Sequence, residues 1–431
     1  MSQRFNYDLE VVNETLCIDM KSFYASVECV ERQLDPLTTM LVVMSRPETG
    51  GGLALATSPK AKELLGITNV SRKHDIPPHP DLYIVPPRMS LYIEKNLKIY
   101  QLLQHYVAEE DILVYSIDEF FVRVTASKRL FNMTTYEFAR RFQDLIFKET
   151  GLYCTIGIGD NMLLSKLALD NEAKTNQDMI AVWQYQDLPK KIWQIQEMTD
   201  FWGINHRTQQ RLNHLGIQSL EELANYDFFR MKENMGVIGQ QLIAHAWGID
   251  RTDMSEVYQP KSKSIGNSQV LTKDYWKRSE LEIVLREMSE QVATRLRKKD
   301  YQTGCVKVSI GYSKNQLEKG FSRQITVPPT NDSKCLVDYV LDLFRQYDTG
   351  GAVRTMSVSY SKLTVSDSLQ LNLFEEPEAL ISRKELDDTI DKIRQRYGFD
   401  ALIHASSQLE GATAVSRSRL IGGHAGGMEG L

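Results

Sequence analysis

The feature of this sequence that most constrains its fold is a pair of adjacent acids inside an apolar stretch. Asp118 and Glu119 stand between two runs of apolar, strand-forming residues, 112–115 and 120–124, and such runs predict strands. Successive side chains of a strand point to opposite faces, so both acids can serve one site only if the chain reverses or bulges between the runs. The economical interpretation is a hairpin with the acids near its tip.

A third acid in a similar setting lies about a hundred residues upstream. Asp19 follows the apolar run 16–18, and the next segment has apolar residues at Phe23, Val27 and Val30, which is helical spacing. Carboxylates at strand ends suit Mg²⁺, and two such ions about 4 Å apart can promote phosphoryl chemistry. On spacing alone a second interpretation stays open, in which the adjacent acids are turn residues and Asp19 caps the helix.

Composition narrows the class of protein. A chain of 431 residues with 42% hydrophobic content can form several domains with real cores. The five cysteines are scattered without a CxxC pair, which favours reduced, buried thiols. The amino terminus is polar and no run of about 18 apolar residues occurs. We therefore expect a cytoplasmic protein that does not enter a membrane.

Charge is unevenly distributed along the chain. The overall net charge is −5, yet residues 259–362 contain 18 Lys or Arg and 11 Asp or Glu, a net of +7. A basic module on an acidic chain is a candidate grip for a polyanion, because phosphate contacts dominate such affinity. An ordinary solvated basic face is the alternative.

Two helix starts carry residues that could bind a triphosphate. The strand predicted at 154–158 ends in a glycine-bearing turn and opens a helix that carries Lys166 in its first turns, where the helix dipole favours phosphate. The helix predicted after Thr57 offers Ser58 and Lys62 in the same way. Each of these residues also fits an ordinary structural or surface role.

Tyr24 lies at the corner between the predicted strand and helix that follow Asp19. A ring at this corner could lie against the sugar of a nucleotide whose phosphates are held by metal, and it would clash with a 2′-hydroxyl. A core or surface aromatic is the alternative.

Residues 201–205, followed by residues 212–217, resemble half or more of a helix-hairpin-helix unit. Such hairpins present backbone N–H groups to DNA phosphates without reading sequence, here at Gly203, Ile204 and Asn205. The pattern prefers a second glycine where Asn205 stands, and asparagine tolerates left-handed geometry. A helix corner used only for packing remains open.

A short peptide near the end of the chain predicts a docking site. It matches QLxLF, by which bacterial proteins dock on the replication sliding clamp, and precedes acids and a proline. The edge of the preceding strand is the alternative. Its matching residues are Gln370, Leu371, Leu373 and Phe374.

The order of predicted elements gives an α+β multidomain protein. Helices alternate with strands up to about residue 175, short helices follow, and a compact α+β module lies beyond them. The proline-rich stretch 77–87 should be irregular. Helices are predicted at 91–107, 135–150, 280–299 and 334–346, and strands near 306–312, 321–327 and 356–363.

Together these motifs resemble a Y-family, or translesion, DNA polymerase of the UmuC-like bacterial branch. The strongest carriers are residues 18–28, 115–119 and 155–159, with Asn161 and Lys166. The resemblance implies a right-hand polymerase whose palm is a mixed sheet with helices. Its implied parts are a palm (1–22 and 86–175), small fingers (23–85), a helical thumb with the hairpin (176–258), a linker (259–267), an α+β little finger (268–366) and a C-terminal tail with the clamp motif (367–431).

The resemblance also implies roles for residues. Asp19, Asp118 and Glu119 would bind two Mg²⁺ ions with help from the Met20 carbonyl, and Tyr24 would be the gate against ribonucleotides. Lys166 would hold the incoming triphosphate, as would Lys62, while Ser58 remains a candidate from its helix start alone. Lys21 stands where many relatives keep another acid, which makes the local field less negative.

The implied activity is low-fidelity, template-directed synthesis across damaged DNA, as in an SOS response. Its partners would be primed DNA, dNTPs and the sliding clamp, and the region after Pro377 is a candidate site for a further regulatory subunit. Two rival functions remain. One is a palm-fold nucleotidyl cyclase, and the other is a clamp-bound, DNA-binding accessory protein without catalysis.

Overall fold

The computed structural model describes residues 5–45, 52–256, 260, 262–314, 316–366 and 377–426. The chain divides into two compact units, Met1–Val257 with Ala425–Leu431, and Tyr258–His424. Both units mix helices and strands, so the predicted α+β multidomain class is confirmed. The clamp-like residues Gln370, Leu371, Leu373 and Phe374 lie outside the described residues.

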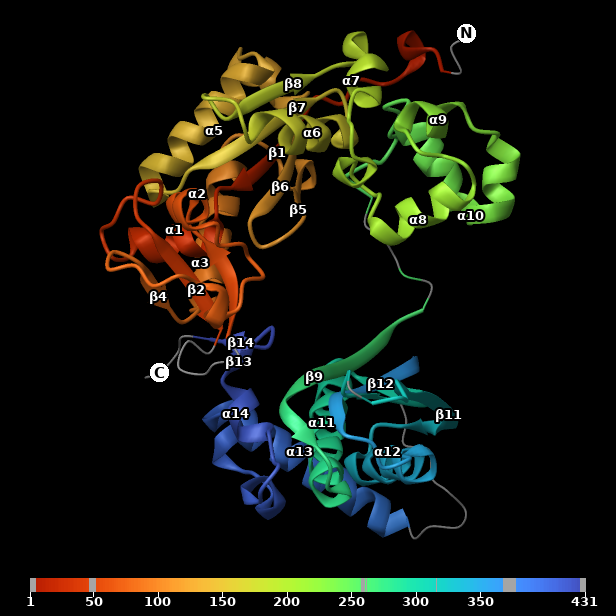
Figure 1. The fold of residues 1–431 in the computed structure, drawn as a ribbon. Coiled ribbons are helices and arrows are strands. Elements are labelled where there is room, and N and C mark those ends of the chain that lie inside the picture. The colour runs from red at the N-terminus through yellow and green to blue at the C-terminus, as the bar shows by residue number, and fades with distance from the viewer. Residues whose placement is uncertain are drawn as a thin grey trace. The chain divides into compact units, whose positions relative to one another are not determined.

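A five-stranded sheet organises the first unit (Figure 1). The central strand β1 pairs antiparallel with β6 on one side and with β7 on the other. The predicted hairpin is correct, because β5 pairs antiparallel with β6 across a turn at residues 115–118. In order across the sheet the strands are β5 (Ile112–Val114), β6 (Glu119–Arg123), β1 (Thr15–Met20), β7 (Cys154–Gly159) and β8 (Ile180–Trp183).

Helix α6 (Met162–Ala168) packs unusually close to β7, and two glycines make this possible. A Cβ atom at Gly157 would lie 2.0 Å from the Ser165 carbonyl oxygen, and one at Gly159 would lie 2.2 Å from the Ser165 nitrogen. No other residue type fits at these two positions. The close packing brings α6 and the π-helix η4 (Leu169–Ala173) onto the sheet face that carries Asp19.

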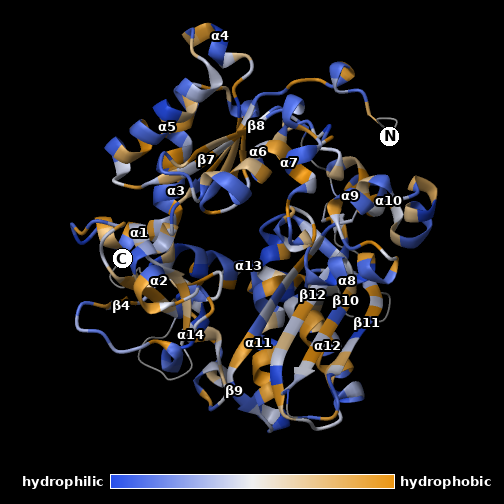
Figure 2. Cartoon of the chain, turned by 45° about the horizontal axis from the view of Figure 1, so that its top comes forward, coloured by the Kyte–Doolittle hydropathy of each residue, from blue (hydrophilic) through white to orange (hydrophobic). Residues whose placement is uncertain are grey.

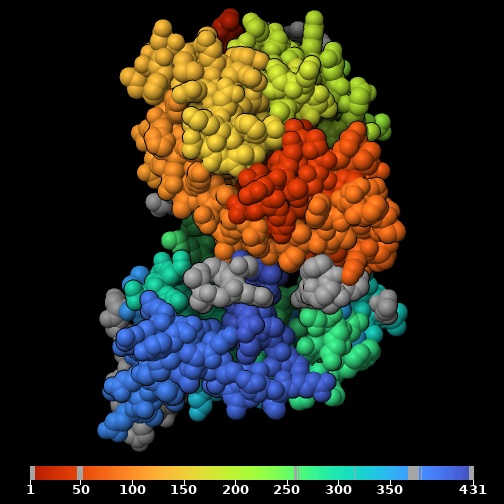
Figure 3. Space-filling model, turned by 90° about the vertical axis from the view of Figure 1, so that its left-hand side faces the viewer, coloured from red at the N-terminus to blue at the C-terminus, as the bar shows by residue number. Residues whose placement is uncertain are grey.

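Two long helices and one short helix complete this part of the unit. Helix α5 has the predicted bounds, begins with a capping box at Thr134 and Glu137, and buries Phe138 and Phe142. In the space-filling view the red, orange and yellow parts of the chain, which supply β1, β6 and β7, form one continuous surface (Figure 3). The helices are α3 (Met89–Gln104), α4 (Ser127–Phe131) and α5 (Thr135–Thr150).

A small three-stranded sheet lies within residues 23–85. Here β2 (Leu41–Ser45) pairs antiparallel with β3 (Leu53–Thr57) and parallel with β4 (Tyr83–Val85). The expectation that the proline-rich stretch is irregular was wrong at β4. Three residues between Pro80 and Pro86 keep their N–H groups and add an edge strand. Helices α1 (Phe23–Val30) and α2 (Pro59–Leu65) accompany this sheet.

The predicted run of helices is present within residues 190–246. The longest helix is not short, however, since α10 runs for 19 residues with a break at Gly236, where φ is 68°. Trp247 fixes the core of this region by donating from its ring nitrogen to the Ala224 carbonyl, at 2.9 Å. The helices are α7 (Lys190–Trp193), α8 (His206–His214), α9 (Leu220–Asn225) and α10 (Phe228–Ala246).

The second unit is a four-stranded antiparallel sheet packed against two helices. Hydrophobic residues of α11 and α12 lie beside β10 and β12 in one core (Figure 2). The predicted helices and strands of this module are present, with ends that differ by a few residues. The elements are β11 (Gly320–Thr330), β10 (Tyr301–Tyr312), β12 (Val353–Val365), β9 (Ser264–Tyr275), α11 (Arg278–Arg297) and α12 (Ser333–Tyr347).

Two expectations about this unit were wrong. The linker predicted at 259–267 overlaps β9, which begins at Ser264 and has few apolar residues to reveal it. The supposed tail contains the 21-residue helix α13 (Pro377–Tyr397). Arg297 holds α13 through ion pairs to Asp387 and Asp391, at 3.0 and 2.7 Å. The remaining elements are α14 (Ala414–Ser418), β13 (Leu420–Ile421) and β14 (His424–Ala425).

Candidate active site

The three predicted acids meet at one end of β1 and β6. Asp19 and Glu119 are directly opposite each other across the two strands, and Asp118 immediately precedes Glu119. The Met20 N–H donates to the Asp118 carbonyl at 2.9 Å, which ties the start of β6 to β1. The hairpin therefore brings the backbones of all three acids together.

The three carboxylates have different partners. Asp19 pairs with Lys174, with 3.0 Å between Oδ2 and Nζ, whereas Glu119 pairs with Lys166, with 2.8 Å between Oε1 and Nζ. Asp118 accepts a hydrogen bond from the Ser116 hydroxyl at 2.6 Å. Among the described residues, no three or more His, Cys, Asp or Glu side chains are grouped so that they could hold a metal ion. The backbones of the three acids therefore converge as predicted. Their carboxylates do not, because Asp19 and Glu119 each turn toward a different lysine.

The electrostatics of Asp19 reflect this crowding. Burial raises the pKa of Asp19, the nearby charges of Asp118 and Glu119 raise it further, and Lys174 opposes both effects. The net result is a pKa above the ordinary aspartate value. The acids therefore form a site that favours an added positive charge.

A cleft of about 430 Å³ opens beside Asp19 and Asp118. Its lining comes from β1, α1, α2 and the turn before β6, so it joins the five-stranded sheet to the small three-stranded sheet. The predicted residues that line it are Asp19, Met20, Tyr24, Lys62 and Asp118, together with Lys21. Glu119, Lys166 and Ser58 do not line it.

Three lysines give the cleft a cationic side. Lys62 donates to the Ser22 hydroxyl at 3.1 Å, and Lys21 and Lys174 also line the cleft. Burial lowers the pKa of Lys62, and the charges of Lys174 and Lys21 lower it further against the opposing effect of Asp19. Cations that repel one another in this way favour a polyanionic ligand.

Lys174 is a cleft residue that the sequence pattern does not mark. Lys174 follows the π-helix η4. A π-helix has more residues per turn than an α-helix, so Lys174 does not lie on the face that the residue spacing of α6 would give it. The residue also pairs with Asp170 at 2.8 Å, so it bridges η4 and the acid at the end of β1. Nothing in the local composition distinguishes it from a surface lysine.

Lys166 has a different position from the one that the sequence suggests. Its ammonium group is largely buried and contacts Glu119 and Asp170. Burial alone would lower the pKa of Lys166, but the neighbouring Cys17, Glu119 and Asp170 outweigh burial and raise it. Lys166 thus neutralises Glu119 behind the cleft and does not face the cleft itself.

Ser58 is a structural residue in this fold. Its side chain is buried, its hydroxyl donates to the Thr39 carbonyl at 2.7 Å, and it accepts from the Leu41 N–H at 2.9 Å. It also caps α2 through the Ala61 N–H. These contacts use the Ser58 hydroxyl to join β2 to α2. The hydroxyl therefore does not reach the wall of the cleft.

Comparison with known proteins identifies the family. A model described as the impB/mucB/samB family matches residues 18–170, and one for the C-terminal domain of that family matches residues 262–373. A protein of Bacillus subtilis (strain 168), provisionally named UV-damage repair protein UvrX, is 39% identical over 410 residues, which are 95% of this chain and 97% of that protein. The chain belongs to the impB/mucB/samB family.

Other members of the impB/mucB/samB family are similar over the same span. DNA polymerase IV 2 of Bacillus subtilis (strain 168) is 34% identical over 94% of this chain and 97% of its own length. DNA polymerase IV 2 of Halalkalibacterium halodurans is 30% identical over 94% of this chain and 98% of its own length. The resemblance to Y-family polymerases of the UmuC-like bacterial kind is confirmed.

Polymerases of this family depend on divalent cations, and the donor set of the site fits them. Asp19, Asp118 and Glu119 offer the hard carboxylate oxygens that such ions prefer. In the structure the ammonium groups of Lys174 and Lys166 lie against two of these carboxylates, where they stand in for a bound cation. The donor atoms thus have the chemistry that a divalent cation prefers, while the carboxylates of Asp19 and Glu119 are turned toward lysines and the three acids are not grouped around one point.

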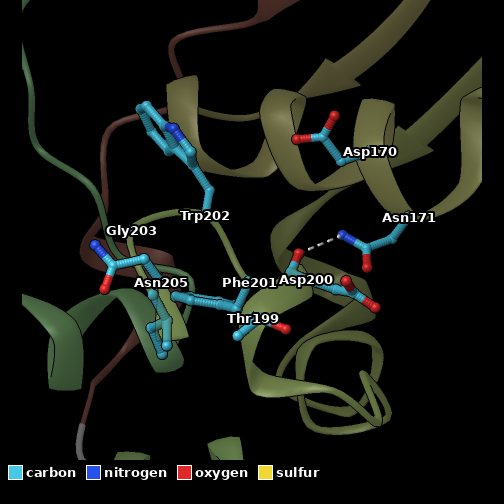
Figure 4. Close-up of a pocket in the computed structure, with 9 residues that line it drawn as sticks. Asp170, Asn171, Thr199, Asp200, Phe201, Trp202, Gly203 and Asn205 are labelled. Carbon is cyan, nitrogen blue, oxygen red and sulfur yellow. Dashed lines mark hydrogen bonds between the residues drawn. The ribbon is translucent and has the colours of Figure 1, made fainter. Parts of the chain in front are cut away.

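The predicted DNA-binding hairpin lies beside a second, open pocket of about 630 Å³ (Figure 4). Gly203 has φ of +100°, which a glycine tolerates best. Asn205 is not left-handed, in contrast to the expectation. It is extended, with φ of −95°, and caps α8 by accepting from the Thr208 N–H at 2.9 Å. At one side of the pocket the Asn171 amide donates to the Asp200 carbonyl.

The hairpin packs against the turn that carries the acids. The Trp202 ring contacts the rings of Tyr115 and Phe121, with centroid separations of 6.0 and 5.9 Å.

Among the helices of the described residues, none has the length and apolarity needed to cross a membrane.

Proposed function

We propose that this protein is a template-directed DNA polymerase that extends a primed template with dNTPs and synthesises across damaged DNA. The observation that carries the proposal is the shared cleft, in which Asp19 and Asp118 face Lys62, Lys174 and the Tyr24 ring. Relatives over almost the full chain are named DNA polymerase IV 2 and UV-damage repair protein. A catalytically silent accessory protein would have no use for such a cleft.

The acids would hold the catalytic cations. We assign two Mg²⁺ ions to Asp19, Asp118 and Glu119, with the Met20 carbonyl assisting. These residues would hold the ions where such cations would favour proton loss from the primer 3′-oxygen and would stabilise the departing pyrophosphate. Because the cations supply this chemistry, no side chain of the cleft needs to act as an obligatory base.

The lysines of the cleft would bind the triphosphate. Lys62 and Lys174 project into the same cleft as the acids, so they can neutralise phosphate charge beside the attacked phosphorus. Lys166 would act indirectly, because it is paired with Glu119 behind the cleft wall. This assignment replaces the triphosphate role that the sequence pattern gives to Lys166.

Tyr24 would select the sugar. Its half-buried ring lines the cleft, and burial, reinforced by the charge of Asp118, raises the pKa of the Tyr24 hydroxyl. A ring in this position would clash with a 2′-hydroxyl on the incoming nucleotide. We therefore assign Tyr24 as the gate that excludes ribonucleotides.

The fold supports the right-hand layout that the family resemblance implies. The five-stranded sheet would be the palm, and the three-stranded sheet within 23–85 the fingers. The helical region within 176–258 would be the thumb, where Gly203, Ile204 and Asn205 offer backbone N–H groups to a DNA phosphate. The four-stranded sheet with its two helices would be the little finger, and its basic composition suits the DNA backbone.

Docking on the sliding clamp is proposed from sequence alone, through Gln370, Leu371, Leu373 and Phe374. Tethering of this kind raises the local concentration of the enzyme at the primer end and offsets weak DNA binding. The helix α13 that follows the motif packs on α11.

A primer-extension assay tests the proposal. The purified protein, Mg²⁺ and dNTPs are added to primed templates that are undamaged or contain an abasic site, with and without a bacterial sliding clamp. We expect extension on both templates and stimulation by the clamp. Replacement of Gln370, Leu373 and Phe374 by alanine should remove only the stimulation. Absence of DNA-dependent incorporation would contradict the proposal and favour a different phosphotransferase.

A further inference from the structure

The ring of Tyr24 is backed by a second tyrosine that does not reach the cleft. Tyr92, in the first turn of α3, stacks on Tyr24 with ring centroids 4.4 Å apart and planes inclined by 13°. The side chain of Tyr92 has 0% exposure and is absent from the cleft lining. Tyr92 therefore supports the gate ring from the protein side.

The hydroxyl of Tyr92 fixes the position of this support. It donates to Glu28 Oε1 at 2.7 Å. Glu28 stands one helical turn after Tyr24 on α1, so the two residues share a helix face. Tyr92 thus contacts α1 at two points, with its ring on Tyr24 and its hydroxyl on Glu28.

Glu28 is itself held firmly. Arg88 donates to both of its carboxylate oxygens, at 3.0 and 2.7 Å, and Arg32 forms a further ion pair with it. Burial raises the pKa of Glu28, but the hydrogen bonds from Arg88, Tyr92 and Arg32 outweigh burial and lower it. Glu28 therefore stays ionised as a fixed acceptor between α1 and α3.

This arrangement exceeds what packing requires. An apolar cluster at the same place would stabilise the fold without the desolvation of a carboxylate. A buried network of charged hydrogen bonds instead restricts side chains to one geometry, which is what a site residue above it needs. The residue above it is Tyr24.

We propose that Tyr92, tied to Glu28, is a positioning residue that fixes the plane of the Tyr24 ring and thereby sets the discrimination against ribonucleotides. The inference rests on the proposed polymerase function. A gate ring excludes a 2′-hydroxyl only if it cannot withdraw, and the stacked Tyr92 ring occupies the space into which Tyr24 would withdraw.

The test measures the ratio of kcat/KM for a dNTP to kcat/KM for the matching rNTP. Tyr92→Leu removes the stacked ring, and Tyr92→Phe keeps the ring but removes the bond to Glu28. We expect the ratio to fall roughly tenfold in Tyr92→Leu and by a smaller factor in Tyr92→Phe. The kcat/KM for the dNTP should stay within about threefold of the wild-type value.

A double-variant comparison separates positioning from general loosening. In the Tyr24→Ala background, Tyr92→Leu should lower the ratio no further, because the gate is already absent. Tyr106→Leu is the matched control, since Tyr106 packs edge-on against Phe138 and Phe142 and does not line the cleft. It should leave the ratio unchanged.

Several results would overturn the inference. One is a wild-type ratio in a folded Tyr92→Leu protein, and another is an equal loss in Tyr106→Leu. If Tyr92→Leu fails to fold by thermal melting, Tyr92→Phe decides, and an unchanged ratio contradicts the role of the bond to Glu28. A wild-type protein that cannot use dNTPs overturns the proposed function and this inference together, whereas normal dNTP use with an unchanged ratio overturns the inference alone.

Discussion

The five-stranded sheet of the first unit and the four-stranded sheet of the second differ in what they bury. The first ends in Asp19 and Glu119, which are largely withdrawn from solvent and paired with lysines. In the second, no charged residue within the four strands is buried, and its inner face is apolar. Buried charge is costly to a fold. Its presence at the end of the first sheet is therefore what the proposed active site requires, whereas the apolar inner face of the second sheet suits a scaffold role in presenting the DNA-binding surface.

The largest expected effect separates these roles at the acids. Asp118→Ala should lower primer extension on the order of a thousandfold, because it removes a cation ligand and its transition-state stabilisation. DNA binding and the melting temperature should change little. Glu110→Ala, which removes an exposed acid just before β5, is the control and should keep activity. Normal primer extension by Asp118→Ala would contradict the assignment of the acids at the end of the five-stranded sheet as the catalytic site.

The scaffold sheet should respond in the opposite way. Leu285→Ala removes a fully buried side chain from α11 and should lower the free energy of unfolding by about 2–5 kcal/mol. The rate of nucleotide addition per folded, DNA-bound molecule should remain near that of the wild type. Val365→Ala, at an exposed position, should change stability by about 0.5 kcal/mol or less. If Leu285→Ala lowered the catalytic rate but not the stability, the scaffold role of the four-stranded sheet would be contradicted.

The two lysines that neutralise the acids should differ in their effects. Lys174→Ala should raise the KM for dNTP roughly tenfold, since it removes a charged contact to the triphosphate. Lys166→Ala should instead lower stability, because it leaves the buried charge of Glu119 without its cationic partner. Steady-state kinetics and thermal melting of both variants distinguish these outcomes. A KM effect confined to Lys166→Ala would restore the assignment suggested by the sequence.

The smallest expected effect is a pH dependence at Lys62. Its pKa is below the ordinary lysine value, so it loses charge at lower pH than a free lysine, and dNTP binding should weaken as pH rises. The KM for dNTP should rise a few-fold between about pH 8 and pH 10 in the wild type and less in Lys62→Arg, which stays charged. Lys60→Ala, on the same helix but outside the cleft, should follow the wild-type profile. Identical profiles for wild type and Lys62→Arg would remove Lys62 from triphosphate binding.

The backbone of the site was predictable because it depends on local patterns. Alternation around Asp118 and Glu119 predicts a hairpin, and the helical spacing after Asp19 predicts the corner that carries Tyr24. These patterns act within a few residues of the chain. The structure agrees with them.

The side-chain pairing could not be predicted, because it depends on long-range packing. The approach of α6 to Gly157 and Gly159 places Lys166 behind Glu119, and the π-helix η4 turns Lys174 toward Asp19. Helix α13 was missed for the same reason, since its anchor is the distant Arg297. Contacts between residues far apart in sequence leave little local signal.

Cation binding tests the central claim most directly. Mn²⁺ can be titrated into the protein bound to primed DNA and a non-hydrolysable dNTP, and electron paramagnetic resonance then counts the bound ions. We expect two Mn²⁺ ions in the wild type and fewer in Asp19→Asn and Asp118→Asn. Equal binding by these variants and the wild type, or no bound Mn²⁺ at all, would contradict the assignment of the three acids as the cation site.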